Sequence, residues 1–435
     1  MSSAPDKPSL SAELSRREFI AVAAGTAGAM LIKPELVRGT AANSSIRVGL
    51  LGCGGRGTED ATNLIDTGGA RVVALADLFQ DQLDIAHKHF DEMQQAKGYP
   101  ALDTSQLFVG PDSYHRMMLS KEVDAVVIAT PPYYHPKHLE AAVAAGKHVY
   151  LEKPVAVDVP GALKVMEIGR RAEGKLSLDV GFQIRDCPPF VELVKRIHDG
   201  ALGKIVCGEA HYLTGYIDRP AWPKASPVER RLRNWVYDRT LSGDIIVEQN
   251  IHVIDICNWI LKSHPLKASA SGGRQGRPAD DGDAFGNYNV IFYYPDDVYM
   301  TFSSTQFIKG WWDVTERFFG TKGTSQSPYA GPLGIWGDEP WQYAASTKPA
   351  VEPQAFSVTG NFTSNLEQAD QEKKRAFVES ITSGKFHNQA DKGAESALSC
   401  IMARTAAYKG HEVTWENTLK SKEVFDPRID LNKLS

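Results

Sequence analysis

The apolar residues in the first half of the chain follow two alternating patterns. Short continuous apolar runs end near a glycine or a charged residue, and between them lie longer segments in which apolar residues recur every three or four positions. The short runs predict strands, at 46–51, 71–76, 123–129 and 148–151. The longer segments predict helices, at 58–67, 82–93, 112–119 and 136–145. Strands that alternate with helices predict a doubly wound parallel sheet, which binds ligands beyond the carboxyl ends of its strands.

The second half of the chain has strands separated by turn residues rather than by helices. Turns such as residues 294–297, Tyr-Pro-Asp-Asp, lie between apolar runs that predict strands, at 204–213, 286–294, 298–307 and 314–319. The segment 242–260, in which apolar and polar residues alternate at helical spacing, predicts one helix. Because a domain has about 100–200 residues, we expect two domains after the N-terminal segment, 43–165 and 166–435.

Composition places the chain among soluble globular proteins. It has 435 residues, of which 42% are apolar and 23% charged, and this excludes a wholly disordered, collagenous or coiled-coil chain. A formal net charge of -5 gives no sign of the basic surface that nucleic acids require. The cysteines are too far apart for a redox pair or a zinc pattern, so we expect no metal site; they are Cys53, Cys187, Cys207, Cys257 and Cys400.

Two adjacent arginines precede a weakly apolar stretch near the N-terminus. Arg16 and Arg17 stand before residues 21–32, and the small residues 40–42, Thr-Ala-Ala, follow. This layout is typical of a twin-arginine signal peptide. We therefore expect the export machinery to remove residues 1–42 and to leave a periplasmic protein without a stable membrane anchor, because the stretch is shorter than the about 20 residues that span a bilayer. The alternative is a structural helix with two solvated arginines.

A glycine-rich loop follows the first predicted strand. Its sequence, Gly-Cys-Gly-Gly-Arg-Gly at 52–57, has the G-x-G-x-x-G spacing of dinucleotide-binding loops. In this pattern Gly52 permits a tight turn, Gly54 lets the backbone approach a pyrophosphate, and Gly57 lets the next helix pack on the strand. Asp77, 20 residues beyond Gly57, ends the second strand, where a carboxylate accepts hydrogen bonds from a ribose. The alternative is a glycine turn with a surface aspartate.

The cofactor that fits this pattern is NAD. Asp77 would repel the 2'-phosphate of NADP, and neither Leu78 nor Phe79 supplies a cation to receive it. Because the twin-arginine route carries folded proteins, we expect the cofactor to be tightly bound. The predicted cofactor-binding residues lie in the loop and at later strand ends, and they are Gly52, Gly54, Gly55, Arg56, Gly57, Asp77, Thr130, Pro131, His135, Glu152 and Lys153.

Several further motifs resemble those of the glucose-fructose oxidoreductase and inositol dehydrogenase family, known as Gfo/Idh/MocA. They are Thr-Pro-x-x-x-His at 130–135, Gly-Lys-His-Val at 146–149, Glu-Lys-Pro at 152–154, Gly-Phe-Gln-Ile-Arg at 181–185, Gly-Ala-Leu-Gly-Lys-Ile at 200–205, Glu-x-x-x-His at 248–252 and Ala-Ala-Tyr-Lys-Gly at 406–410. The resemblance implies a Rossmann domain followed by an α/β domain built on a large open, mostly antiparallel sheet. It also implies a homodimer or homotetramer, because relatives often pack through the open face of that sheet.

Lys153 is a candidate catalytic residue. It follows a predicted buried strand and stands between Glu152 and Pro154, at the sheet edge where the nicotinamide of a bound dinucleotide would lie. There an ammonium group can donate a hydrogen bond to a reacting hydroxyl and stabilise the alkoxide that develops as hydride leaves. The alternative is a solvated surface lysine.

His252 is a candidate general base. In the predicted helix Glu248 precedes it by one turn and Asp255 extends the same stripe, so that Glu248 would orient the ring while it removes a hydroxyl proton. Relatives usually have aspartate where this chain has Glu248. An ordinary helical side-chain pair and a zinc pair remain alternatives, although no further cysteine or histidine cluster supports the metal.

Four other residues are candidates for contact with the substrate. Arg185 follows a predicted strand, Asp255 extends the histidine stripe, and Tyr212 and Trp235 are aromatic side chains of the kind that stack on a sugar ring. The alternatives are a structural salt bridge for Arg185 and core or interface packing for the aromatic residues.

Together these features predict an NAD-dependent oxidoreductase that transfers hydride from a sugar, a glycoside or a cyclic polyol. Free NAD is scarce outside the cytoplasm, so an exported enzyme has to regenerate its cofactor in place. An alternative is therefore an NAD-dependent glycosidase, in which transient oxidation acidifies a neighbouring C–H, elimination releases the aglycone and the hydride returns. A third hypothesis is a non-catalytic protein that binds NAD and sugar.

Overall fold

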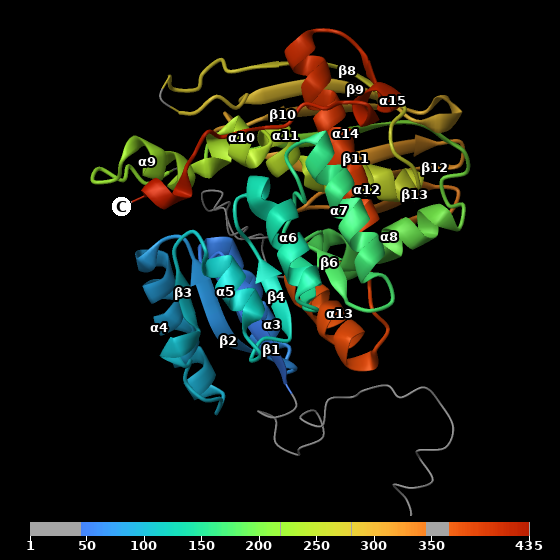
Figure 1. The fold of residues 1–435 in the computed structure, drawn as a ribbon. Coiled ribbons are helices and arrows are strands. Elements are labelled where there is room, and N and C mark those ends of the chain that lie inside the picture. Colours follow the sequence, from blue (N-terminus) through green and yellow to red (C-terminus); the bar gives the residue numbers. More distant parts are fainter. Residues whose placement is uncertain (1–44, 218, 280, 345–364, 435) are drawn as a thin grey trace, which may run out of the picture. The chain divides into compact units, whose positions relative to one another are not determined.

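The computed structural model describes residues 45–217, 219–279, 281–344 and 365–434 (Figure 1). The predicted export segment, 1–42, lies outside the described residues, so export stays a prediction. The homodimer or homotetramer stays one as well. None of the described helices combines the length and the apolar character that a membrane span needs.

The first sheet, sheet A, is parallel and has six strands in the order β3-β2-β1-β4-β5-β6. Its strands are β1 (Ile46–Leu51), β2 (Ala70–Asp77), β3 (Leu107–Val109), β4 (Ala125–Ile128), β5 (His148–Leu151) and β6 (Leu178–Val180). The helices that connect them are α3 (Gly55–Asp66), α4 (Gln80–Ala96), α5 (Ser113–Leu119), α6 (His135–Ala144) and α7 (Val159–Ala172). The doubly wound sheet is confirmed. The expected domain boundary at residue 165 falls within α7, and β6 adds a strand to sheet A beyond it.

The second sheet, sheet B, has nine strands in the order β14-β13-β12-β11-β7-β10-β9-β8-β15. Its strands are β7 (Ile205–Leu213), β8 (Lys267–Gly273), β9 (Asn287–Tyr293), β10 (Tyr299–Thr305), β11 (Asp313–Gly320), β12 (Gly323–Gln326), β13 (Gly334–Gly337), β14 (Trp341–Gln342) and β15 (Val413–Thr414). Only β7 and β10 pair in parallel, which confirms the mostly antiparallel sheet. Along β10 buried and more exposed residues alternate, because one face packs on the core.

The predicted helix 242–260 is wrong in its continuity. The structure instead has three helices there: α10 (Arg239–Ser242), α11 (Ile245–Glu248) and α12 (Ile251–Leu261). Gly243 and Asp244 break the first junction, because both adopt positive φ, 86° and 81°. The carboxylate of Asp244 is buried and accepts hydrogen bonds from the Tyr408 hydroxyl and the Phe285 amide, which holds this unusual conformation.

Two C-terminal helices, α13 (Ala369–Ser383) and α14 (Ala390–Lys409), pack against helices that connect the strands of sheet A (Figure 1). Helix α13 lies against α3, and α14 lies against α7. Phe377 of α13 joins the apolar core beneath β1 and β2. The neighbouring lysine of α13, Lys373, is fully buried and pairs with Asp179 and Asp186. The last part of the chain thus contributes both apolar and charged contacts to the first domain.

Candidate active site

The three glycines of the G-x-G-x-x-G spacing, Gly52, Gly54 and Gly57, meet three different constraints. Gly52 has φ of 95°, a conformation that favours glycine. At Gly57 a Cβ atom would lie 2.0 Å from the Gly52 carbonyl oxygen, so helix and strand are in backbone contact. At Gly54 a Cβ atom would meet nothing within 4 Å. The loop is therefore closed against the protein at its two outer glycines and open at the middle one.

Gly54 is also the N-cap of α3, and no side chain caps the helix there. The amide groups of the first turn are left for a ligand, and the positive end of the helix favours an anionic one. Asp77 lies beside the loop and accepts hydrogen bonds from the amides of Cys53, at 2.7 Å, and Phe79, at 2.9 Å. An open glycine, an uncapped helix and a carboxylate at the end of β2 fit the pyrophosphate and ribose of a dinucleotide.

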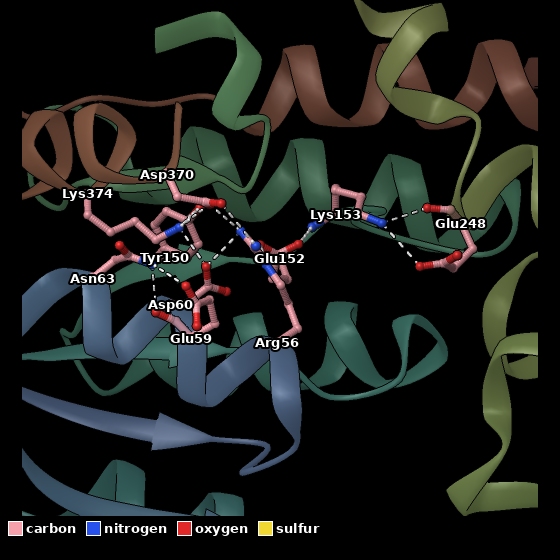
Figure 2. A network of polar contacts seen from close by, with 10 residues as sticks. All are labelled: Arg56, Glu59, Asp60, Asn63, Tyr150, Glu152, Lys153, Glu248, Asp370 and Lys374. Atoms are coloured by element: carbon pink, nitrogen blue, oxygen red, sulfur yellow. Dashed lines mark hydrogen bonds and ion pairs between the residues drawn. The ribbon is translucent and has the colours of Figure 1, made fainter. Parts of the chain in front are cut away.

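The Arg56 side chain, which is predicted to bind the cofactor, instead contacts other residues of the protein. Its guanidinium group donates to Glu152, at 3.0 Å, and to Asp370, at 2.6 Å, and it forms an ion pair with Asp60, at 2.8 Å (Figure 2). Its neighbour Gly55, the first residue of α3, is exposed. Gly54 and Gly55 are thus open toward solvent, whereas the Arg56 side chain contacts three carboxylates.

His135 ties two strand-end segments together. One ring nitrogen lies 2.8 Å from the Pro154 carbonyl oxygen and the other lies 2.6 Å from that of Thr130. Burial lowers the pKa of His135 to about 4, although the two carbonyl groups favour the protonated ring. Pro131, which follows Thr130, caps the short helix η3 (Pro132–Tyr134). His135 is thus a structural link between the ends of β4 and β5.

Lys153 lies beyond the end of β5 and reaches α11 of the second half (Figure 2). Its ammonium group donates to the backbone oxygen of Glu248, at 2.7 Å, and to the Glu248 carboxylate, at 3.1 Å. Both side chains are largely buried. Its backbone amide donates to the Glu152 carboxylate, at 3.0 Å, and its peptide bond to Pro154 is cis. The position and direction of Lys153 are fixed at both ends of the residue.

His252 occupies the first turn of α12 and is buried. Burial lowers its pKa well below the ordinary value, and the charges of Lys153 and Arg56 lower it further. Its Nδ1 atom has no hydrogen-bond partner among the described residues. The predicted pairing of His252 with Glu248 is not found among the described residues, because the Glu248 carboxylate accepts a hydrogen bond from Lys153 instead.

The four residues predicted to contact the substrate make contacts with other residues of the protein. Arg185 and Asp255 form a two-pronged buried ion pair, at 2.7 and 2.9 Å, and Ser396 donates to the same carboxylate. The Asp255 carboxylate is therefore occupied by Arg185 and Ser396. Tyr212 is buried and packs against another tyrosine ring, and Trp235 packs on a small cluster that includes Tyr237. Tyr212 and Asp255 are buried, whereas Arg185 and Trp235 keep part of their surface exposed.

Three buried amide side chains near His252 were missed from the sequence. Within the described parts of the chain, no partner is found for either amide atom of Asn250, for Oε1 of Gln183 or for Nε2 of Gln249. Asn250 has no exposed surface and stands at the N-terminus of α12, two residues before His252. Because buried polar groups are nearly always satisfied, these amides are candidates to bind hydroxyl groups of a substrate. In the sequence, Gln249 and Asn250 stand close to His252, and Gln183 lies in the motif at 181–185.

Comparison with known protein families agrees with both halves of the structure. Residues 46–180 match the model described as the oxidoreductase family with an NAD-binding Rossmann fold. Residues 190–326 match the model described as the GFO/IDH/MocA C-terminal domain. The two matches together span more than half of the chain.

Individual relatives point in the same direction. The chain is 29% identical to the inositol 2-dehydrogenase of Acidothermus cellulolyticus over 241 residues, which are 55% of this chain and 60% of that protein, so less than two thirds of that relative is matched. It is 26% identical to the inositol 2-dehydrogenase of Rhizobium meliloti over 296 residues, 67% of this chain and 78% of that protein.

A solved structure supports the fold. The structure of levoglucosan dehydrogenase in complex with NADH and levoglucosan superposes with a TM-score of 0.65 at 20% identity, and the match covers 85% of this chain and 99% of that one. At this identity the likeness establishes a shared fold.

The contrast between Gly54 and Gly57 yields a prediction. Gly57→Ala places a methyl group against backbone, so we expect it to lower the free energy of unfolding by about 1–3 kcal/mol, measured by urea denaturation. Gly54→Ala places the methyl group in open space, so stability should stay at the wild-type value while the dissociation constant for NAD rises about tenfold or more. Calorimetric titration that finds wild-type NAD affinity in Gly54→Ala would contradict the assignment of the loop.

Proposed function

The chain belongs to the Gfo/Idh/MocA family of oxidoreductases, and we propose that it oxidises a hydroxyl group of a sugar, a glycoside or a cyclic polyol with NAD as the hydride acceptor. The observation that carries this proposal is the placement of two groups. Lys153 follows β5 and contacts Glu248, four residues before His252. The His252 ring lies edge-on to Phe182, which follows the neighbouring strand β6. Lys153 and His252 both stand on the edge of sheet A where the glycine loop opens.

The cofactor side of the site supports NAD over NADP. When bound, NAD accepts the hydride. The uncapped end of α3 and the open backbone at Gly54 suit its pyrophosphate, and Asp77 suits the adenosine ribose. Asp77 keeps its carboxylate beside the loop through the amides of Cys53 and Phe79, where its charge would oppose the additional phosphate of NADP. Tight binding is part of the proposal, because the twin-arginine pattern predicts that the cofactor travels with the protein.

Lys153 supplies the electrostatic part of the reaction. An ammonium group has three N–H donors, and Glu248 accepts two hydrogen bonds from Lys153. The third donor is available for the oxygen of the reacting hydroxyl. As the C–H bond breaks, the charge that develops on this oxygen is stabilised by a donor already held in place.

His252 takes the hydroxyl proton. Burial and the charge of Lys153 keep the ring neutral, so that a nitrogen lone pair accepts the proton in the oxidative direction. The unpartnered amides of Asn250, Gln183 and Gln249 offer both donors and acceptors. Hydroxyl groups also both donate and accept, which favours a substrate with several of them.

Substitution of the two catalytic residues tests the proposal. We expect Lys153→Met and His252→Ala to lower kcat by about 10²–10⁴, with little change in NAD affinity. Formation of NADH is followed by absorbance over a panel of pyranoses, their glycosides and cyclic polyols, and the same panel with NADP should react more slowly. Lys164→Met is the matched control, because this lysine is partly exposed and pairs with Glu140 away from Lys153 and His252.

Two outcomes would overturn the proposal. Variants of Lys153 and His252 that oxidise the best substrate as fast as wild type would remove both residues from the chemistry. Release of nitrophenol from a nitrophenyl glycoside without accumulation of NADH would instead indicate glycosidase chemistry, and bound NAD without any turnover would indicate a binding protein.

The pKa of His252 gives a prediction about pH. Because its folded pKa lies well below the ordinary value, the ring stays neutral where an unperturbed histidine, with a pKa of about 6.5, becomes protonated. Initial rates of oxidation, as kcat/KM, should therefore not fall between about pH 8 and pH 6. Removing the nearby cation raises the pKa, so the residual activity of Lys153→Met should lose its base form at higher pH than wild type. A wild-type acid limb centred near the ordinary histidine pKa would contradict this assignment.

A further inference from the structure

A cluster of largely buried charged side chains lies beside Lys153, to its left in Figure 2. Its members come from α3, the end of β5 and α13, and they are Arg56, Asp60, Glu152, Asp370 and Lys374. Asp370 and Lys374 are separated from Arg56 by more than 300 residues in the chain. None of the steps in the proposed reaction uses the two residues of α13, and nothing in the sequence motifs assigns them a role.

Arg56 is the centre of the cluster. It belongs to the dinucleotide loop, and its guanidinium group contacts three carboxylates from three elements: Asp60 of α3, Glu152 after β5 and Asp370 of α13. The planar fork of arginine allows these contacts at once, which a lysine cannot reproduce. Movement of Arg56 would therefore displace both the loop and Glu152.

Glu152 transmits this position to Lys153. Its Oε1 accepts from Arg56, and its Oε2 accepts from the backbone amide of Lys153. Behind it stands Gly181, where a Cβ atom would lie 2.5 Å from Oε1. The Glu152 carboxylate is thus held between the Arg56 guanidinium group, the Lys153 backbone amide and Gly181, where a larger side chain would collide with it.

Helix α13 completes the cluster. Lys374 is fully buried and contacts Asp60 at 2.6 Å, Asp370 at 3.2 Å and the Tyr150 hydroxyl at 2.8 Å. Burial would raise the pKa of Asp370, but the charges of Lys374 and Arg56 lower it below its ordinary value. Burial raises the pKa of Asp60 to about 7 against the same two cations. Helix α13 adds one cation and one carboxylate to the cluster, and Lys374 gives the buried Asp60 carboxylate a second cationic partner beside Arg56, which matters because a buried carboxylate without a cation is costly.

We propose that Asp370 and Lys374 are positioning residues, which hold Arg56 and Glu152 so that the dinucleotide loop and the Lys153 ammonium group take their working positions together. The inference rests on the proposed function, because the position of Lys153 matters only if this residue acts on the substrate oxygen. It assigns to α13 a part in catalysis although α13 touches no reacting atom.

The test compares Asp370→Asn with Glu372→Gln. Glu372 lies on the same helix and pairs with Arg375 at the surface, so its variant should keep wild-type kcat and NAD affinity. Asp370→Asn keeps the shape and removes the charge that holds Arg56. We expect its dissociation constant for NAD to rise and its kcat to fall about 10- to 100-fold, since small displacements of a catalytic group have effects of this size.

A double variant separates positioning from general damage. If Asp370 acts through Lys153, the change Asp370→Asn should cause no further loss of kcat in the Lys153→Met background, while it still weakens NAD binding. An equal loss of kcat in both backgrounds, or wild-type kcat in Asp370→Asn, would overturn the inference.

A second variant covers failure of the first to fold. Arg56→Lys keeps the positive charge and loses the planar guanidinium group. Its kcat and its dissociation constant for NAD are compared with and without Lys153→Met, as for Asp370→Asn. A wild-type protein that oxidises nothing on the panel refutes the proposed function. NAD affinity then decides the inference by itself, and an unchanged dissociation constant in the Asp370→Asn and Arg56→Lys variants would overturn it.

Discussion

The contact between Lys153 and Glu248 is the constraint on which the site depends. It joins the end of a strand in sheet A to a short helix in the second half of the chain, and it is largely shielded from water. Two of the three ammonium donors are used in this contact, so the direction of the third is set. Without Glu248, the lysine would be a flexible side chain at a sheet edge, and the substrate oxygen would have no fixed donor to meet.

The break between α10 and α12 makes that contact possible. Gly243 and Asp244 turn the chain with positive φ, and the four-residue helix α11 then presents both the backbone oxygen and the carboxylate of Glu248 to Lys153. His252 lies in the first turn of the next helix, α12, which begins at Ile251. Its low pKa follows from the same arrangement, because it shares the buried space of the Lys153 charge. One irregular segment thus fixes Lys153 and carries His252, the two residues to which the proposed mechanism assigns the electrostatic and the basic roles.

Much of this could be predicted from local sequence. The alternation of apolar runs and helical segments predicts sheet A, and the glycine loop with Asp77 predicts the nucleotide site, because both depend on residues close together in the chain. The motif at 152–154 places Lys153 at a strand end for the same reason. Local patterns also misled: recurring apolar residues from 242 to 260 predict one helix although Gly243 lies near its start. The positive φ of Asp244 depends on Phe285 and Tyr408, which are distant in sequence.

The remaining features depend on contacts distant in sequence. Arg56 has the position of a cofactor ligand in its motif, yet its side chain donates a hydrogen bond to Asp370, more than 300 residues later. Arg185 and Asp255 satisfy each other across two helical segments, and the isolation of Asn250 is visible only when its surroundings are known. Such pairings are decided by tertiary packing, which a single sequence does not display.

The central claim is that hydride passes from a carbinol carbon to NAD at this site. Incubation of the protein with NAD and a panel of pyranoses and cyclic polyols deuterated at their carbinol carbons tests it directly, with mass spectrometry of the recovered nucleotide. We predict that the nicotinamide ring gains one deuterium from the matching substrate, which is recovered as a ketone or lactone. NAD that binds to the protein and is recovered unlabelled from every deuterated compound would contradict the account.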